Sequence, residues 1–454
     1  MKLLLVAHNY NPMLSLELNK IKENLNNLSK KIDRKYDYQF SIGLSEGVTV
    51  TSRCGSVESI EHHQDNVLGV KIFYENRQGF AGTNNLSNES IEKTIEKAKN
   101  IATNTQPDIC NGLPDTNFVT SDNMPKLDIY HPSKIDIKEI INITHECEKS
   151  AFEYDKRINN SEGSSFSYTN NNALLVNSNG ADGMKQTTNF TLSCIVVAED
   201  GKSKERDYEY STTRDFKKLE SPKKVGAQAG YKTISRLGAK TIKTRVCPVL
   251  FSPEMSVSIF NDFLSAIQGA AIYRRASFLL DKIDQPIFPD FINISEEPHL
   301  PDGMGSSPFD AEGVLTKNKS IVSRGKLKTY LLDTYSARKL NSISTSNKGL
   351  VTNIVVDTEK EKIENIISSM PDGIYITEMM GSGVNIITGD YSRGAFGYLI
   401  KDGEIKHPVT EITVASNLKD MFKNIIGLGS DIDRRSNINI GSVLINNITI
   451  GGAS

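Results

Sequence analysis

Cysteine is scarce in this 454-residue chain, and its distribution excludes two common uses of the residue. The five cysteines are widely scattered and include no CxxC pair: Cys54, Cys110, Cys147, Cys194 and Cys247. An odd, dispersed set is not typical of a disulfide framework or of a zinc knuckle. We therefore expect reduced thiols and a cytoplasmic protein.

Long hydrophobic runs and an excess of one charge are also absent. No stretch approaches the roughly 20 apolar residues that a membrane-spanning helix needs. The apolar run at residues 3–7 is too short for the core of a signal peptide. The formal net charge of -2 gives no overall attraction to nucleic acid. We expect neither a membrane nor a nucleic acid as a partner, and we interpret the basic pair Arg434–Arg435 as solvated surface.

Common catalytic motifs are missing as well. The chain has no GxSxG nucleophile elbow and no GxxxxGK[ST] phosphate loop. The stretch HECEKS at residues 145–150 begins like a zinc-peptidase helix, but Lys149 and Ser150 stand where the second histidine would be needed. Its apolar residues recur at helical spacing, so Cys147 is predicted to be a small buried residue of a core.

The other histidines offer one alternative. His62 and His63 are adjacent on an expected strand, so their side chains point to opposite faces and cannot easily hold one ion together. His299 lies in the proline-bracketed loop EEPHLPDG. The runner-up hypothesis is an independent metallopeptidase site formed by this histidine and nearby acids: Glu296, Glu297 and Asp302.

The hydrophobic pattern predicts an α+β protein of two domains. The length is sufficient for two or three domains with sizeable cores. The first half mixes strand-like segments, typical of an antiparallel sheet, with helices. These helices are expected at residues 14–31, at 88–103, after Ser133 and at 221–240. A boundary near residue 240 divides an N-terminal α+β domain, 1–240, from a C-terminal β-rich domain, 241–454.

The second half is predicted to contain many short strands. A buried strand in RVCPVLFSP is followed by a helix with the sequence EMSVSIFNDFLSAI. Glycine turns separate the strands that come after it. The step from Lys401 to Glu404 predicts a two-residue hairpin turn, because Asp-Gly tolerates the positive φ angles that such a turn needs. The residues alone show no recognisable catalytic constellation.

Six long stretches of the second half, in this order, carry a resemblance to a known family. They are PVLFSPE at 248–254, YRRASFLLDKIDQPIFPDF at 273–291, HLPDGMGSSPFDAEGV at 299–314, TYLLDTYSARKL at 329–340, the segment 378–422 and IGLGSDIDRRSNINIGSVL at 426–444. With these stretches the chain resembles the PmbA, or TldE, branch of the TldD/PmbA family, also called modulators of DNA gyrase. The N-terminal half is compatible with the resemblance.

The resemblance implies a concrete role. TldD and PmbA subunits are similar in fold and pair as a heterodimer. The pair acts as a cytoplasmic metallopeptidase on unfolded or leader peptides, in peptide maturation and antitoxin degradation. In the TldD branch an HExxxH helix supplies two histidine ligands for zinc, and a cysteine near the C-terminus is implicated as a third.

This sequence departs from that pattern at each position. Pro253 aligns with the first histidine, Glu254 with the glutamate and Ser258 with the second histidine, and no cysteine follows Cys247. Proline and serine cannot replace imidazole at a zinc site. The resemblance therefore implies a subunit that holds no metal or other cofactor, with zinc in a TldD-like partner. Glu254, at the degenerate position, would then favour the helix dipole from the first turn.

An extended peptide is the expected substrate, bound by addition to a sheet edge. Charged and glycine-rich segments supply the candidates for lining the peptide chamber: Asp310, Glu312, Arg338, Asp390, Tyr391 and Arg393. The alternative interpretation is that these residues form buried ion pairs and turns that hold the β-rich domain together.

Two other assemblies stay open. Without its TldD-like partner the chain could form a homodimer. A regulator that binds gyrase or an RNA-control protein, with no proteolysis, is the third hypothesis. The family's gyrase name motivates it, and the balanced charge does not argue against a protein partner.

Overall fold

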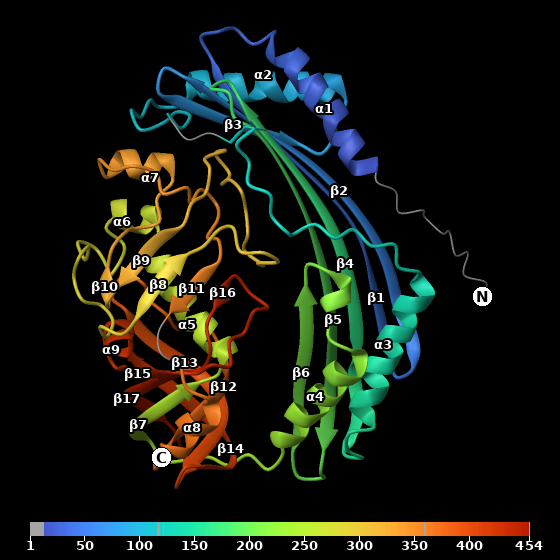
Figure 1. Ribbon diagram of the computed structural model, residues 1–454, viewed down its shortest axis with the longest axis vertical. Helices are drawn as coiled ribbons and strands as arrows, with labels where there is room; N and C mark the ends of the chain where they lie inside the picture. Colours follow the sequence, from blue (N-terminus) through green and yellow to red (C-terminus); the bar gives the residue numbers. More distant parts are fainter. Residues whose placement is uncertain (1–12, 116–118, 121, 358–359, 454) are drawn as a thin grey trace.

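The computed structural model describes residues 13–115, 119–120, 122–357 and 360–453, and Figure 1 shows that it has two lobes. Residues 13–240, here called the N-terminal half, form a long curved sheet with helices on its outer side. Residues 241–453, the C-terminal half, form a lobe that faces the inner side of this sheet. The apolar run at 3–7 lies outside the described residues, and the domain boundary at 240 remains a prediction.

The large sheet has six antiparallel strands in the order β3-β2-β1-β4-β5-β6. The strands are β1 Asp37–Arg53, β2 Ser56–Tyr74, β3 Arg77–Thr83, β4 Ile158–Asn177, β5 Asp182–Glu199 and β6 Lys204–Thr213. Strands β1 and β2 are longer than the separate segments that the sequence suggested, because they pair along their whole lengths. β6 forms the edge of the sheet that lies nearest the C-terminal half (Figure 1).

Alternation along the strands gives this sheet one apolar and one polar face. The buried apolar side chains of β1 all occupy even positions: Phe40, Ile42, Leu44, Val48 and Val50. They pack at one end of the sheet against α1 Met13–Ser29 and α2 Asn88–Asn104, and at the other end against α3 Ile137–Phe152 and α4 Pro222–Ser235. Odd positions carry polar residues such as Gln39 and Lys185, whose side chains bond to the C-terminal half.

The helices of the N-terminal half begin where local sequence predicts. The Ser87 side chain caps α2 by accepting a hydrogen bond from the backbone N–H of Ser90, as expected for a serine at this position. Asp136 caps α3 in the same manner. Helix α4 ends at Ser235, before the predicted end at residue 240.

The HECEKS stretch has a structural role in α3. Cys147 is fully buried between α3, α4 and the sheet, which confirms the prediction. Glu148, one residue on, is also buried, and its carboxylate accepts the backbone N–H groups of Cys54 and Gly55 at 2.9 Å. This carboxylate satisfies donors in the tight turn between β1 and β2 and fastens that turn to the helix.

The C-terminal half contains two sheets. One has the order β14-β13-β12-β7-β17-β15, and an additional pairing of β14 with β17 closes most of it into a small barrel. Its strands are β7 Arg245–Phe251, β12 Asp372–Met380, β13 Asp390–Lys401, β14 Glu404–Asn417, β15 Ile425–Leu428 and β17 Val443–Gly451. The predicted hairpin is confirmed, since Asp402 and Gly403 join β13 to β14 with φ of 55° and 75°.

The second sheet has the order β10-β9-β8-β11-β16. Its strands are β8 Asn293–Glu296, β9 Lys319–Ser323, β10 Lys326–Leu327, β11 Ile354–Asp357 and β16 Ile438–Asn439. The helices of this half are α5 Pro253–Ala266, α6 Gly269–Tyr273, α7 Thr334–Lys339, α8 Ile363–Ser368 and α9 Leu418–Lys423. Helix α5 lies between the sheets and contributes Ile259, Phe260 and Phe263 to their common core. No described helix is long and apolar enough to cross a membrane.

Candidate functional site

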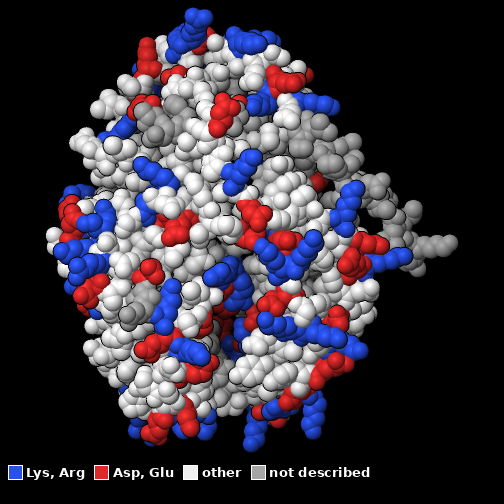
Figure 2. Space-filling view, viewed as in Figure 1, with Lys and Arg blue, Asp and Glu red and all other residues white. Residues whose placement is uncertain are grey.

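A groove separates the edge of the large sheet from the C-terminal half, and Figure 2 shows it as a hollow bordered by charged side chains. Two adjoining cavities of about 960 Å³ each form the groove. The Arg214 cavity follows β6 along residues 209–214, and the Glu254 cavity lies between α4 and the start of α5. Gln228, Ile432, Arg434 and Arg435 line both. This space is sufficient for a segment of extended polypeptide.

The edge strand β6 presents its backbone to the groove. Arg435 Nη1 donates a hydrogen bond to the carbonyl oxygen of Tyr210 at 3.1 Å, so this carbonyl points away from β5 and into the groove. By the alternation of an antiparallel ladder, Tyr208 and Thr212 also direct their backbone groups outward. Four tyrosine rings line the Glu254 cavity: Tyr208, Tyr231, Tyr375 and Tyr398.

Arg435 joins the two halves at the centre of the groove. Its guanidinium lies 2.6 Å from Glu209 on β6, 2.5 Å from Glu254 on α5 and 2.9 Å from Asp433. It also lies over the ring of Tyr210, 4.2 Å from the centroid. Burial opposes its charge, but the hydrogen bond to Asp433 and the nearby carboxylates raise the pKa of Arg435. The interpretation of Arg434–Arg435 as solvated surface is therefore wrong for Arg435, while Arg434 is exposed.

Glu254 is the first residue of a polar face of α5, and each of the first two residues of this face contacts an arginine side chain. The helix starts with Pro253 at its first turn, as the sequence predicts. Ser258, one turn further, accepts a hydrogen bond from Arg393 Nη1 at 2.8 Å, and Arg393 Nη2 donates to the carbonyl of Met379. Asp262 follows after another turn. Burial raises the pKa of Asp262 to about 6, although the charge of Arg393 opposes the shift.

These residues do not fit a zinc ion. The face of α5 offers two carboxylates, Glu254 and Asp262, and the hydroxyl of Ser258, and the sequence of this helix has no histidine or cysteine. Glu254 and Ser258 already contact guanidinium groups, whose positive charge would repel a divalent cation. Zinc sites need imidazole, thiolate or carboxylate ligands that are free to bind the metal.

The structure also does not bring His299 and the nearby acids together as the metal site that the sequence suggested. His299 Nε2 lies 3.0 Å from Thr316 Oγ1, whereas Glu296 is buried among Lys319, Asn347 and Thr352. Across the described ranges, the one group of three side chains close enough to share a metal combines Asp302 with Asp128 and His131. The carboxylate of Asp302 is already paired with the ammonium of Lys218.

Three of the predicted chamber residues hold local structure. Asp310 is 1% exposed and accepts backbone N–H groups from Glu312, Val314 and Lys348. Burial, together with the charge of Glu312, raises the pKa of Asp310 to about 6. The hydroxyl of the buried Tyr391 contacts Met379 Sδ. Asp390 accepts hydrogen bonds from Thr388 and Asn417 in an exposed turn. These three residues, like Arg393, fit the alternative interpretation.

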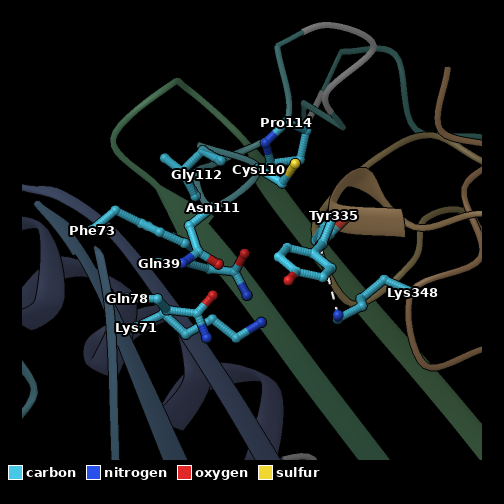
Figure 3. Close-up of a pocket in the computed structure, with 12 residues that line it drawn as sticks. Gln39, Lys71, Phe73, Gln78, Cys110, Asn111, Gly112, Pro114, Tyr335 and Lys348 are labelled. Carbon is cyan, nitrogen blue, oxygen red and sulfur yellow. Dashed lines mark ion pairs between the residues drawn. The ribbon is translucent and has the colours of Figure 1, made fainter. Parts of the chain in front are cut away.

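Arg338 and Glu312 instead lie where α7 approaches the N-terminal half. Arg338 donates to the carbonyls of Cys110 and Leu113 and forms an ion pair with Asp115 at 3.0 Å. Glu312 lines a separate polar pocket of about 310 Å³, drawn in Figure 3. Lys71 from β2 extends into this pocket toward Tyr335 and Lys348 (Figure 3). Burial lowers the pKa of Lys71, which forms no ion pair in the described part of the chain.

The sequence therefore indicated only part of the site. Glu254 lies in the groove, but the sequence did not identify its partner Arg435 or the second carboxylate that Arg435 binds, Glu209. The stretch ERDYEYSTT at residues 205–213, one of the strand-like segments of the first half, is typical of a strand and forms most of β6. Nothing in that stretch indicates that the strand is an edge or that it faces a groove, since both depend on distant segments.

Comparisons with known proteins agree with this architecture. Models of domain 1, the central domain and the C-terminal domain of PmbA/TldA metallopeptidases match residues 43–102, 130–237 and 244–452. Metalloprotease PmbA of Escherichia coli is 40% identical over 91% of this chain and 92% of its own length. The PmbA homolog of Haemophilus influenzae is 39% identical, covering 89% and 90%.

Solved structures share the fold. A protein of Bacteroides thetaiotaomicron that has been proposed to modulate DNA gyrase is 25% identical, with a TM-score of 0.89 over 96% of this chain and 99% of that chain. TldE of Thermococcus kodakarensis is 19% identical, with a TM-score of 0.80 over 95% and 100% of the two chains, and supports the fold alone.

Proposed function

Because this chain belongs to the PmbA/TldD metallopeptidase family, we propose that it is the peptide-binding subunit of a two-subunit metallopeptidase. A TldD-like partner would hold the zinc ion and perform hydrolysis. The substrates would be unfolded or leader peptides, which can enter a groove as extended chains. Alone, this subunit would be catalytically silent.

The observation that carries this proposal is the state of Glu254 and Ser258. Hydrolysis by a zinc peptidase requires a metal-bound water and a carboxylate positioned to accept its proton. Glu254 is bound by Arg435 at 2.5 Å, and Ser258 is bound by Arg393 at 2.8 Å. A carboxylate that is held in an ion pair is not free to accept a proton from a metal-bound water. The side chains on this face of α5 therefore bind arginines from other segments of the chain and are not placed to activate water.

The groove supplies the complementary part of the proposal, a place for a peptide. An extended peptide can pair with outward backbone groups of β6 such as those of Thr212 and place alternate side chains in the two cavities. The N–H groups of Tyr208 and Tyr210 and the carbonyl of Tyr210 already bond to the side chains of Asp207, Glu209 and Arg435. The tyrosine rings of the Glu254 cavity offer apolar surface together with hydroxyl groups. Backbone pairing of this type depends little on sequence, which suits a protein that accepts unrelated unfolded chains.

The test is a cleavage assay with and without this chain. Adding the purified full-length chain to its TldD-like partner should increase hydrolysis of an unfolded peptide, and the two proteins should co-elute. Absence of both effects would contradict the proposal. A matched pair of variants examines the groove, because Thr212→Pro removes an outward N–H from the edge of β6 while Thr212→Ala keeps it. Only the proline variant should reduce stimulation.

The name of one solved relative favours a second candidate function. The Bacteroides thetaiotaomicron protein has been proposed to modulate DNA gyrase. This chain would then bind gyrase as a regulator without proteolysis. A pull-down that returns gyrase but no TldD-like subunit would favour that function, whereas recovery of the TldD-like subunit alone would favour the peptidase complex.

A further inference from the structure

Arg214, which follows β6 and lines the groove, is a partly buried cation that forms no ion pair with any described carboxylate. Its Nη1 donates to the carbonyl of Thr188 at 3.2 Å and its Nη2 to the carbonyl of Met304 at 2.5 Å. Its Nε has no acceptor among the described residues. Burial lowers the pKa of Arg214. Carbonyl groups therefore satisfy part of the guanidinium, but no described acid neutralises it.

A second cation, Lys185, interacts electrostatically with Arg214, although it is not among the residues that line the cavity. Lys185 projects from the polar face of β5, and its Nζ lies 3.2 Å from Ser307 Oγ in the C-terminal half. Burial lowers the pKa of Lys185, and the charge of Arg214 lowers it further. No carboxylate of the described chain forms an ion pair with Lys185. Two adjacent cations held away from water are costly unless an anion accompanies them.

The acids that line the Arg214 cavity do not supply that anion. Glu209 is paired with Arg435 and Lys232, Glu220 with Lys224, and Asp302 with Lys218. The fourth acid, Glu297, accepts a hydrogen bond from the hydroxyl of Ser295. Arg434 adds an exposed guanidinium to the cavity wall and forms no ion pair within the described ranges.

The Glu254 cavity is different, because the cations that line it and not the Arg214 cavity are matched by acids. Arg236 is paired with Asp207 at 3.2 Å and with Glu378 at 2.7 Å, and Lys406 is paired with Glu404. Positive charge without a counter-charge is therefore concentrated at one end of the groove. A bound peptide would experience this end as a site for a negative group.

We propose that the Arg214 cavity is a carboxylate subsite, which binds an acidic side chain or the free C-terminus of the peptide in the groove. This inference rests on the proposed peptide-binding function and adds a preference to it. A carboxylate suits the site because it accepts strong charge-assisted hydrogen bonds from guanidinium and ammonium groups. The groove would then fix the position of an otherwise variable peptide by one charged group, while β6 binds its backbone.

The test measures peptide affinity by fluorescence anisotropy with the full chain. Three versions of one labelled peptide are compared: an amidated form with a single Asp, the same form with Asn, and the Asn form with a free C-terminus. The carboxylate peptides should bind about tenfold more tightly than the neutral one, as hydrogen bonds to charged groups imply. The preference should weaken at high salt. The form that gains affinity identifies whether a side chain or the C-terminus occupies the site, and a gain in either supports the proposal.

Substitutions at the site test whether the preference depends on its positive charge or on the hydrogen bonds that these side chains make within the protein. Arg214→Gln and Lys185→Met should reduce the affinity for the carboxylate peptide to that for the neutral peptide and leave neutral binding unchanged. Arg214→Lys should retain the preference. Lys406→Gln, in the Glu254 cavity, is the matched control and should retain it as well. If Arg214→Gln does not fold, Arg434→Gln decides and should weaken the preference, because Arg434 lines the same cavity, is exposed and forms no ion pair in the described structure.

Three results would overturn the inference. Equal binding of acidic and neutral peptides would remove the carboxylate subsite but leave the peptide-binding function intact. Absence of binding by all three peptides, with the chain alone and in its complex, would contradict both. A preference that survives in Arg214→Gln and Lys185→Met would show that another group recognises the carboxylate.

Discussion

The guanidinium of Arg435 lies 2.5 Å from the carboxylate of Glu254. The two residues are far apart in the chain, and their contact lies at the centre of the groove between the two halves. In a zinc peptidase the equivalent carboxylate must be free to take a proton from a metal-bound water. Here it is bound to a cation that also contacts the edge strand β6. Glu254, at the position of the catalytic glutamate in the TldD motif, therefore takes part in the contact between the two halves.

A structural role for Glu254 predicts how its loss affects stability and activity. Glu254→Ala should lower the free energy of unfolding by about 1–2 kcal/mol, because it leaves Arg435 with fewer partners in a partly buried setting. Peptide cleavage by the complex with the TldD-like partner should stay within about twofold of normal. Chemical denaturation and the cleavage assay measure the two effects. A fall in kcat of about a hundredfold, with stability unchanged, would instead assign Glu254 a catalytic role.

The pKa of Asp262 predicts a pH-dependent effect on stability. Its folded-state pKa of about 6 exceeds the ordinary value of 3.8, mainly because burial disfavours the charged form. The folded state therefore binds the proton more tightly. The stabilising contribution is complete below about pH 4 and is lost as the pH rises through 6. Asp262→Asn should raise Tm at pH 7.5 and have little effect at pH 4, as thermal unfolding across this range would show.

Asp390 provides the control with the opposite sign. Hydrogen bonds from Thr388 and Asn417 lower the pKa of Asp390, so its contribution to stability is present at neutral pH and lost in acid. Asp390→Asn should lower Tm at pH 7.5. If both substitutions shift Tm in the same direction at that pH, the assigned environments of these two carboxyl groups are wrong.

Lys71 predicts that removal of a charge can stabilise the protein. Burial lowers the pKa of Lys71 at the pocket in Figure 3, and neighbouring acids offset this only in part. Lys71→Met should increase the free energy of unfolding by about 1 kcal/mol at pH 7, because a buried charge without a partner is replaced by an apolar chain. Lys22→Met is the matched control, since Lys22 pairs with Asp182 at 2.6 Å and its loss should destabilise. A destabilised Lys71→Met variant would indicate that Lys71 has a partner in solution.

Local chemistry explains which features the sequence could predict. The cap at Ser87 and the turn at Asp402–Gly403 depend on a few adjacent residues, and both are present. The burial of Cys147 follows from helical spacing within one segment. The HExxxH motif is continuous in sequence, so the family resemblance could also identify the positions on α5 where its histidines are missing.

Other features depend on residues that are distant in the chain. The partners of Arg435 come from β6 and α5, and Arg338 binds a loop of the other half. Charged residues in glycine-rich segments looked suitable for a chamber, but Tyr391 and Asp310 are buried by elements that the local pattern does not specify. Arg214 was missed because its lack of an acidic partner is a property of the folded groove.

The proposed division of roles is tested by the zinc content of the purified chain, of its TldD-like partner and of their complex, measured together with peptide cleavage. We expect no stoichiometric zinc in this chain alone and about one zinc ion per complex, with activity only where zinc is present. Stoichiometric zinc in the isolated chain, accompanied by peptide cleavage, would contradict this division of roles. The metal site would then have to be sought among the remaining histidines and acids.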